Sequence, residues 1–435
     1  MAPYTNLDTI SVSTAVRTTT DTPLRHAARV GLLGCGTIGR AVVASIAEHP
    51  HLNLICTGAL VRDTARRRDD IGAPRVTDPQ RVLDQADVIV EVLGGVEPAR
   101  TLVEAALLRR IPVVTANKTM MAAHGPELRA LARETGTPLL FEAAVVAGVP
   151  FVGAIARRPL LSGVSALTGI LNGTSHFITT GIERGVDFAD VLASAQAAGY
   201  AEPDSTADVS GRDAAEKLTI LLHLCGVSTA RVSQLCRRGI DSLSALDLAA
   251  AKALGGTIKP VAHASLDTAQ PGSWVGPAFV PSTHAFAPFT GVTNALHLQW
   301  GSDEPVLFAG PGAGPAVTSA TILDDIVEAL TAKETDTICI GADAHRAARA
   351  ALDLSTPAPS RWFVRASSAA LAPADLAEFL AGRNLPALRV EIGAFGVAAL
   401  TALAPWAVAE KAAAALASLG ATVTLCPSLA REVRS

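Results

Sequence analysis

The sequence contains few charged residues, few aromatic residues and no closely spaced cysteines. Of its 435 residues, 17% are charged and 4% are aromatic, and the formal net charge is −4. This slightly acidic balance gives no electrostatic reason to expect a nucleic-acid partner. The six cysteines form no Cys-x-x-Cys pair, which argues against a zinc site or a disulfide framework and favours reduced thiols in the cytoplasm. No apolar run approaches the roughly 20 residues that cross a bilayer, so we expect no membrane partner.

The length and the pattern of apolar segments predict an α/β protein with three folded units. A chain of 435 residues is long enough for two or three domains, each with its own core. Its Thr-rich start lacks a compact apolar segment and is expected to be a disordered extension rather than a signal peptide. The predicted parts are this extension (1–27), a Rossmann-type doubly wound dinucleotide-binding domain (28–150), an α+β substrate and dimerisation domain (151–335), a linker (336–360) and a small βαββαβ, ferredoxin-like domain (361–435), which we expect to be separate.

A glycine-rich turn separates the first predicted strand from a helical pattern. The turn reads Gly-Cys-Gly-Thr-Ile-Gly, and the strand before it with the helix after it is the context that a dinucleotide-binding fingerprint requires. Gly34 would permit the tight turn, Gly36 the close approach of a pyrophosphate, and Gly39 the packing of helix on strand. The amino end of the helix would bind the phosphates. The candidate cofactor-binding residues here are Gly34, Gly36, Thr37, Ile38 and Gly39.

The residues after the second predicted strand, 52–61, bear on cofactor choice. An acidic residue at this place would hold the ribose hydroxyls of NAD, whereas an arginine can contact the 2′-phosphate of NADP. Arg62 stands there, which favours NADP. The arginines at 66–68 are equally well explained as a solvated helix face.

Two further segments lie where a ligand would bind. Asn117 and Lys118 follow the predicted strand 111–116, and ligands of doubly wound sheets bind beyond the carboxyl ends of the strands. We therefore expect Lys118 to meet the substrate or the nicotinamide. A second glycine-rich turn, which contains Gly312 and Gly314, offers unhindered backbone close to a flat ligand.

The most polar stretch, 199–217, reads GYAEPDSTADVSGRDAAEK. A helix that begins near its end places Asp213 and Lys217 four residues apart. An exposed ion pair or a structural salt-bridge network is the ordinary explanation for such residues. The same helical row continues into Leu221 and Leu224, however, which indicates that it faces protein. A lysine beside several carboxylates would suit a small zwitterion, because carboxylates bind an ammonium group and the lysine binds a carboxylate or a reacting oxygen.

Over roughly residues 28–330 the chain resembles homoserine dehydrogenases. The matching segments, in the order of the family, are GLLGCGTIG, TANK, FEAAVVAGVP, GILNGTS, the polar stretch 199–217 and GPGAG. The resemblance implies interconversion of L-homoserine and L-aspartate 4-semialdehyde by hydride exchange with NADP or NAD, in threonine, methionine and isoleucine biosynthesis. It also implies a homodimer or a higher homo-oligomer. The C-terminal unit resembles the ACT module that some members carry.

The resemblance further assigns roles to individual residues. The catalytic group would consist of Lys118, Lys217 and Asp213, and one of the two lysines would exchange a proton with the reacting oxygen. The amino acid would be held by Thr174, Tyr200, Glu202, Asp208 and Asp213. The cofactor would also contact Arg62, Asn117, Lys118, Gly312 and Gly314. A monovalent cation, Na⁺ or K⁺, would be bound by backbone oxygens of Glu142, Val145, Ala147 and Val149.

Departures from the family pattern leave alternatives open. The run Ser175-His176-Phe177 stands where a Thr-Asn-Tyr type sequence is usual, and Ala147 stands where glycine is more usual. Either change would alter the substrate wall, so a reductase of a different small amino-acid aldehyde is one alternative. The C-terminal unit lacks the Asp-x-Pro-Gly turn that commonly binds an effector, which favours a role in assembly over feedback control. A non-catalytic amino-acid sensor ranks last, because both lysines are present.

Overall fold

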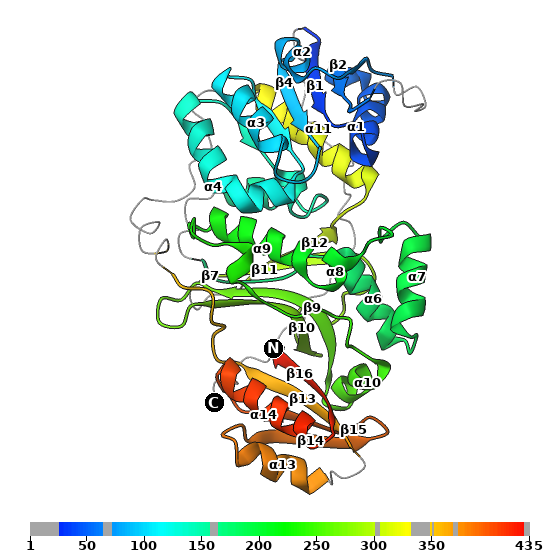
Figure 1. Ribbon diagram of the computed structural model, residues 1–435, viewed down its shortest axis with the longest axis vertical. Helices are drawn as coiled ribbons and strands as arrows, with labels where there is room; N and C mark the ends of the chain where they lie inside the picture. Colours follow the sequence, from blue (N-terminus) through cyan, green and yellow to red (C-terminus); the bar gives the residue numbers. More distant parts are fainter. Residues whose placement is uncertain are drawn as a thin grey trace, which may run out of the picture.

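The computed structural model describes residues 26–63, 72–156, 164–300, 305–331, 349, 352–368 and 373–429. Figure 1 shows three tiers along the long axis: an amino-terminal domain in blue and cyan, a middle domain in green, and a C-terminal unit in orange and red. Among the described helices, none combines the length and the apolar character that are needed to span a bilayer.

The amino-terminal domain is built on a six-stranded parallel sheet with the order β3-β2-β1-β4-β5-β6. This order confirms the predicted doubly wound sheet, whose strand order reverses between β1 and β4. The strands are nearly all apolar because helices cover both faces of the sheet. The elements are β1 (Ala28–Leu33), α1 (Thr37–Glu48), β2 (Leu54–Leu60), β3 (Arg75–Val76), α2 (Pro79–Asp84), β4 (Val88–Glu91), α3 (Ala99–Leu108), β5 (Val113–Thr115), α4 (Lys118–Thr135) and β6 (Leu139–Leu140).

Helix α4 begins earlier than the sequence predicts. The sequence pattern predicts a helix over residues 125–135. In the structure Pro126 lies inside the helix, and the Asn117 side chain caps it by accepting a hydrogen bond from the Met120 N–H at 3.1 Å. Lys118 is therefore the first residue of a helix rather than part of a loop.

The middle domain contributes six strands to a ten-stranded mixed sheet: five in the order β12-β11-β7-β9-β10, and β8, which pairs with β10. Helix α9 contacts α4 on one side and β9 on the other, so it is buried on all sides although its first turn is charged. The elements are α5 (Val152–Ala156), β7 (Val164–Ile170), α6 (Gly173–Glu183), α7 (Phe188–Ala197), α8 (Thr206–Val209), α9 (Arg212–Leu224), β8 (Cys236–Arg237), α10 (Ala245–Ala253), β9 (Gly256–Ser265), β10 (Gly272–Pro281), β11 (Thr293–Trp300) and β12 (Val306–Pro311).

Helix α11 (Pro315–Thr331) packs on the amino-terminal domain, although it was expected to be part of the middle domain. Its residues Ile322 and Ile326 are fully buried in a core shared with Val30 of β1 and Val42 of α1. Figure 1 shows this yellow helix among the blue and cyan ones. Its apolar row predicts burial, but nothing in the local sequence says which domain covers that row.

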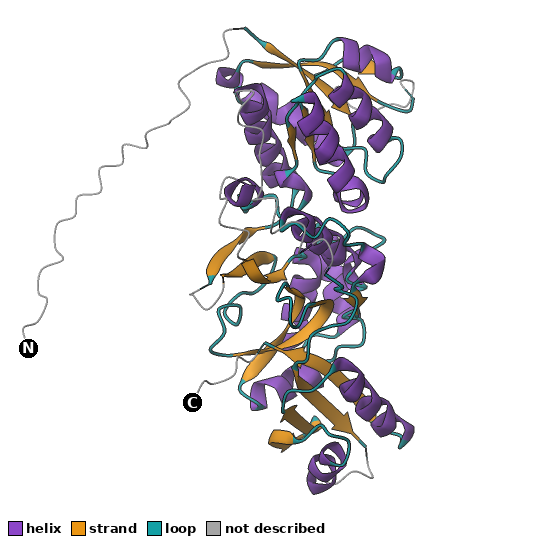
Figure 2. Ribbon diagram, turned by 90° about the vertical axis from the view of Figure 1, so that its left-hand side faces the viewer, coloured by secondary structure: helices purple, strands orange, loops and turns teal. Residues whose placement is uncertain are grey.

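The C-terminal unit has the predicted βαββαβ order, but it is not separate. Its strand β16 pairs with β10 through Phe279 and Ser428, so the ten-stranded sheet continues as β16-β13-β15-β14, which Figure 2 shows from the side. Trp362 shares a core with Trp274 of β10. The elements are β13 (Arg361–Ser367), α13 (Pro373–Ala381), β14 (Ala387–Gly393), β15 (Gly396–Thr401), α14 (Trp406–Ser418) and β16 (Thr422–Ser428).

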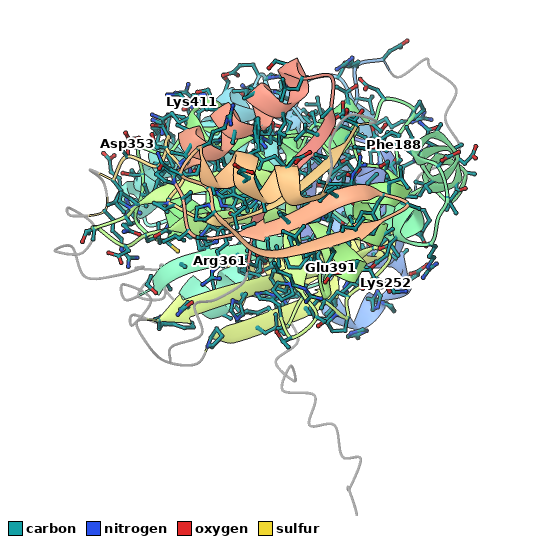
Figure 3. The ribbon with its side chains drawn as sticks, turned by 90° about the horizontal axis from the view of Figure 1, so that it is seen from below. Phe188, Lys252, Asp353, Arg361, Glu391 and Lys411 are labelled. Carbon is teal, nitrogen blue, oxygen red and sulfur yellow. The ribbon has the colours of Figure 1, made fainter. Side chains whose placement is uncertain are left out.

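A second contact holds the C-terminal unit against α10. The Arg389 guanidinium of β14 donates to the backbone oxygens of Ala253 at 3.1 Å and Leu254 at 3.3 Å, which lie at the carboxyl end of α10. Figure 3 views this corner from below and labels Glu391 of β14 and Lys252 of α10, two elements that contact each other. Cationic groups at a helix carboxyl end are favourable. The expectation of a separate unit is therefore wrong, because the sheet, the core and this cap are shared.

Candidate active site

A buried carboxylate lies between two lysines where the amino-terminal and middle domains meet. Asp213, in the first turn of α9, is 5% exposed. Its Oδ1 lies 3.1 Å from Lys118 Nζ, and its Oδ2 lies 3.0 Å from Lys217 Nζ. Asn172 Nδ2 donates to the same Oδ2 at 2.8 Å. The structure thus brings together three predicted catalytic residues from two domains.

The amino-terminal half of this cluster is fixed by a buried acid that the sequence analysis missed. Glu91, at the end of β4, accepts hydrogen bonds from the Thr115 hydroxyl at 2.6 Å and from Asn117 Nδ2 at 3.2 Å. Asn117 also donates to the Gly95 carbonyl at 2.7 Å and caps the helix that begins with Lys118. Burial raises the pKa of Glu91. An acid that ends an otherwise apolar strand was the available signal.

Asn172 organises the other half of the cluster and was also missed. It lies between β7 and α6, where its Oδ1 caps α6 by accepting the Ser175 N–H at 2.7 Å. Its Nδ2 donates to Asp208 Oδ1 at 2.7 Å as well as to Asp213. One side chain therefore caps a helix and joins two carboxylates. An asparagine directly after a strand and before a glycine was the available signal.

The two lysines differ in their surroundings. Lys217 is 10% exposed, and its ammonium also donates to the Leu171 carbonyl at 2.9 Å. Lys118 is 39% exposed. Beside them, the Glu216 carboxylate accepts the Thr119 hydroxyl at 3.1 Å. The cluster therefore has one enclosed ammonium group and one that reaches the surface.

Charge, more than burial, sets the protonation of the central carboxylate. Burial acts to raise the pKa of Asp213, but the charges of Lys217 and Lys118 and the hydrogen bond from Asn172 outweigh it, and the pKa lies below its ordinary value. The charge of Asp213 in turn raises the pKa of Lys118. Burial, and then the charge of Asp213, raise the pKa of Asp208. At neutral pH the cluster thus holds an ionised Asp213 beside a firmly protonated Lys118.

The remaining predicted substrate residues lie on and beside α6. The Thr174 hydroxyl donates to the Tyr200 carbonyl at 2.6 Å, and the Tyr200 ring, 48% exposed, lies 5.2 Å from the Phe177 ring. Glu202 is exposed, and its backbone oxygen accepts a hydrogen bond from Gln196. Asp208 joins the cluster through Asn172, whereas Glu202 lies on the outer part of the loop.

His176 faces away from the cluster. Its Nδ1 lies 2.8 Å from the Thr293 carbonyl and its Nε2 lies 3.2 Å from the Phe289 carbonyl. The side chain is fully buried, and burial lowers its pKa to about 4. These contacts give His176 a structural role, in line with its omission from the predicted catalytic group.

The first glycine-rich turn has the geometry that a pyrophosphate needs. Gly34 has a φ of +107°, and a Cβ on Gly39 would lie 2.3 Å from the Gly34 carbonyl oxygen. A Cβ on Gly36 would meet nothing within 4 Å, so the backbone is open there. Thr37 begins α1 without a side-chain cap, which leaves the first N–H groups of the helix for an anion. Thr37 is exposed and Ile38 is half-buried beside this open end.

The other predicted cofactor residues lie at the same edge of the parallel sheet or next to it. Arg62 is exposed just beyond β2, while the arginines at 66–68 lie outside the described residues. Gly312 and Gly314 form the turn into α11, where Gly314 has a φ of +119° and the Gly312 carbonyl accepts the Ala147 N–H at 3.1 Å. The turn therefore touches the segment that follows β6.

The predicted cation ligands are partly occupied by hydrogen bonds. The Ala147 carbonyl accepts the Thr321 hydroxyl, and the Val149 carbonyl accepts the Phe151 N–H at 2.7 Å. The Glu142 carboxylate accepts two backbone N–H groups at the start of α5. The monovalent cation at Glu142, Val145, Ala147 and Val149 accordingly stays a prediction.

Comparison with known proteins identifies the same family throughout the first two domains. The family model described as "Homoserine dehydrogenase, NAD binding domain" matches residues 34–142, and the model described as "Homoserine dehydrogenase" matches residues 150–327. A homoserine dehydrogenase of Corynebacterium glutamicum is 35% identical over 316 residues, which is 69% of this chain and 71% of that protein. One of Pseudomonas aeruginosa is 36% identical over 320 residues, which is 71% of this chain and 73% of that protein.

Solved structures agree with the sequence comparisons. A homoserine dehydrogenase from Thiobacillus denitrificans has a TM-score of 0.80 and 29% identity, covering 92% of this chain and 98% of that chain. A hyperthermophilic archaeal homoserine dehydrogenase in complex with NADPH has a TM-score of 0.58 and 25% identity, covering 69% of this chain and 97% of that chain. The fold, the family resemblance and the use of NAD(P) are confirmed, whereas the ACT-like identity of the C-terminal unit stays a prediction. The chain is an NAD(P)-dependent oxidoreductase that belongs to the homoserine dehydrogenase family.

Proposed function

We propose that this protein interconverts L-homoserine and L-aspartate 4-semialdehyde, with NADP(H) preferred over NAD(H), and that Lys118, Asp213 and Lys217 form its catalytic group. The observation that carries the proposal is the ionised Asp213 held between two ammonium groups where the two domains meet. A reacting oxygen placed there would have a proton donor within reach and an orienting carboxylate behind it.

The carboxylates around the cluster support an amino-acid substrate. Asp208 is partly buried and its pKa is raised, so an ammonium group that binds beside it relieves an unfavourable charge. Asn172 keeps that carboxylate next to Asp213, which fixes the ammonium end of the substrate relative to the lysines. Thr174, Tyr200 and Glu202 complete the proposed substrate wall.

The lysines would move the proton. Bound nicotinamide accepts or supplies the hydride. When the aldehyde carbon receives that hydride, its oxygen becomes an alkoxide, and a proton from one of the two ammonium groups converts it to the hydroxyl; in the oxidative direction the hydroxyl returns the proton. Asp213 keeps Lys118 protonated and orients both ammonium groups, so its proposed role is positioning.

The proposed cofactor contacts follow the carboxyl edge of the parallel sheet. Gly34, Gly36 and Gly39 with the open end of α1 would hold the pyrophosphate, and Arg62 would contact the 2′-phosphate. Asn117, Gly312 and Gly314 would lie near the nicotinamide.

We further propose a homodimer located in the cytoplasm. Assembly is supported by β12, the last strand of the sheet within the described residues, where Val306 and Leu307 are each 41% exposed. The cytoplasmic location is supported by the free thiols of Cys56, Cys225, Cys236 and Cys426. Analytical ultracentrifugation of the purified chain tests the assembly.

The altered wall at 175–177 does not favour a different substrate. Ser175 is 2% exposed and bonds to Asn172, and His176 is fully buried. Phe177 contacts Tyr200, so it is the one altered side chain next to a proposed substrate residue. The change therefore lies mostly behind the wall rather than on it.

The test is steady-state oxidation of L-homoserine by the purified full chain, followed at 340 nm with NADP⁺ and NAD⁺ in parallel. We expect turnover with L-homoserine, faster with NADP⁺ at equal concentration, and little turnover with L-serine or L-threonine. Binding of cofactor without turnover of L-homoserine would contradict the proposed substrate. Turnover that is equal with both cofactors would contradict the NADP preference alone.

A further inference from the structure

A buried asparagine lies beside the second glycine-rich turn without a protein partner for its side chain. Asn294, on β11, is 1% exposed. Among the described residues, neither its Oδ1 nor its Nδ2 has a hydrogen-bond partner. Buried polar side chains in native proteins nearly always have a partner, and leaving one unpaired is unfavourable. An orphaned carboxamide at a functional site therefore calls for a ligand that satisfies it.

Gly312 makes the room that this carboxamide occupies, and Gly173 lies beside it. A Cβ on Gly312 would lie 2.1 Å from Asn294 Oδ1 and 2.8 Å from Asn294 Nδ2. A Cβ on Gly173, at the start of α6, would lie 3.4 Å from Asn294 Oδ1. The carboxamide thus lies between the turn into α11 and the residue next to Asn172. Only glycine at 312 leaves space for it.

The position of Gly312 places the carboxamide on the nicotinamide side of the proposed cofactor site. The Gly312 carbonyl accepts the Ala147 N–H, and Ala147 follows β6. The half of the sheet formed by β4, β5 and β6 lies across the switch point from α1, where the pyrophosphate would bind. The end of the cofactor that reaches this half is the nicotinamide.

We propose that Asn294 binds the carboxamide of the nicotinamide ring, a role that rests on the cofactor placement proposed above. A primary carboxamide offers one acceptor and one donor group, as the asparagine side chain does, so the two pair reciprocally. Gly312 covers Asn294 in this structure, so the pairing requires the turn into α11 to move aside, and Gly312 has no side chain that would oppose this movement. Asn294 thereby selects the cofactor head group and fixes the ring beside Lys118.

The test compares ligands that differ only at the head group, using isothermal titration calorimetry on the full chain. The ligands are NADP⁺, its 3-acetylpyridine analogue, in which a methyl ketone replaces the carboxamide, and 2′-phospho-ADP-ribose, which lacks the ring. We expect the wild type to bind NADP⁺ about tenfold more tightly than the acetyl analogue, or about 1.4 kcal/mol. We expect Asn294→Leu to bind NADP⁺ about tenfold more weakly, to lose less affinity for the acetyl analogue, whose ketone keeps only the acceptor half of the pair, and to bind 2′-phospho-ADP-ribose as the wild type does.

A matched control is Thr168→Val, which changes a buried polar side chain of the adjacent strand β7 whose partner, His263 Nδ1, lies 2.9 Å away. It should lower the melting temperature and leave all three affinities unchanged. Equal loss of all three ligands in Asn294→Leu, or unchanged NADP⁺ binding, would overturn the proposal. Equal binding of NADP⁺ and the acetyl analogue by the wild type would overturn it without any variant. If the wild type bound 2′-phospho-ADP-ribose but L-homoserine were not oxidised, the proposed reaction would fail while the head-group comparison would still decide the role of Asn294.

Discussion

Two buried aspartates each pair with basic side chains, but only one of these pairs is sealed, that is, enclosed by protein with both partners buried. Asp247, in the first turn of α10, is 0% exposed and pairs with Arg365, which is 4% exposed. Its other oxygen accepts the N–H and the hydroxyl of Ser244 at 2.8 and 2.7 Å, and Arg365 also donates to the Phe395 carbonyl. The negative charge of Asp247 and the positive charge of Arg365 are therefore buried as one balanced pair. This pair joins α10 to β13, and its role is structural.

The Asp213 cluster is built differently. It contains two ammonium groups for one central carboxylate, with Lys118 39% exposed and the carboxylate of Asp208 close by. The cluster has more charged and hydrogen-bonding groups than pair with one another. A ligand can therefore bind to the groups that are left without a full set of partners. The difference indicates how a functional ion cluster is told from a structural one: the structural cluster closes on itself, and the functional cluster keeps groups for a ligand.

The largest effect is expected from removing the enclosed lysine. Lys217→Met should lower kcat about 10²- to 10⁴-fold, since a positioned general acid is lost. NADPH binding should change little, and so should the melting temperature, because Asp213 keeps Lys118 and Asn172 as partners. The comparison of Lys217→Met with Lys118→Met, by kcat and its pH profile, tells which lysine exchanges the proton.

A buried lysine outside the cluster provides the control. Lys259 is 1% exposed and lies 3.3 Å from the Glu183 carboxylate. Lys259→Met should lower the melting temperature and leave kcat/KM of the folded enzyme unchanged. If Lys217→Met kept activity within tenfold of the wild type, the Asp213 cluster would have a structural role, as the sealed Asp247 pair does.

The sealed pair should respond in the opposite way. Arg365→Met leaves the Asp247 charge buried and uncompensated, which typically costs about 3–5 kcal/mol of folding stability. We expect a clear drop in melting temperature with kcat of the folded enzyme retained. The double variant Arg365→Met/Asp247→Leu should recover much of the loss, since no buried charge remains. Loss of activity without loss of stability would break the comparison.

The parts of the site that depend on a local sequence pattern could be predicted from the sequence. Asp213, Lys217 and Leu221 are four residues apart, so the helical period alone predicts their shared face and its burial, and the structure confirms both. The strand-turn-helix pattern at Gly34 likewise predicted the shape of the nucleotide turn.

The missed features depend on contacts between segments far apart in the chain. Glu91 and Asn172 were not selected because a lone acid or amide at the end of a strand has several ordinary roles, and only tertiary neighbours show which one applies. The docking of α11 and the shared core of Trp362 were missed for the same reason. An apolar row predicts burial but does not name the partner.

A smaller effect, on KM, is expected from substitution of Asp208, the carboxylate that we propose binds the substrate ammonium group. The pKa of Asp208 is raised by burial and by the charge of Asp213, so on acidification Asp208 is protonated before an ordinary aspartate would be. KM for L-homoserine should therefore rise as the pH falls toward this raised pKa, at a higher pH than the protonation of an ordinary aspartate would produce. Asp208→Asn should raise KM about ten- to hundredfold and remove this pH dependence, since a charged hydrogen bond is worth about 1.5–3 kcal/mol.

The matched control is an exposed aspartate of the same loop. Asp204 accepts the Thr206 N–H, and the side-chain hydrogen bond from Thr206 lowers its pKa. Asp204→Asn should leave KM and its pH profile as in the wild type. An unchanged KM in Asp208→Asn would show that the ammonium group is held elsewhere, with Glu202 as the next residue to substitute.

The smallest effect, on cofactor affinity, is expected from substitution of a single exposed arginine, and two arginines can be compared. Arg29 lies near the amino end of β1 and pairs with Asp87 at 2.7 Å, whereas Arg62 is exposed beyond the carboxyl end of β2, where the adenosine ribose would lie. Arg62→Ala should weaken NADPH about tenfold, or about 1.4 kcal/mol, and leave NADH almost unchanged, because only NADPH carries the 2′-phosphate. Arg29→Ala should change neither affinity, since exposed ion pairs contribute little and this one lies at the opposite edge of the sheet. Both affinities can be measured by fluorescence titration of the reduced cofactors.

Equal losses of affinity for NADPH and NADH in Arg62→Ala would mean that Arg62 shapes the turn and does not contact the 2′-phosphate. The NADP preference would then have to come from residues 66–68.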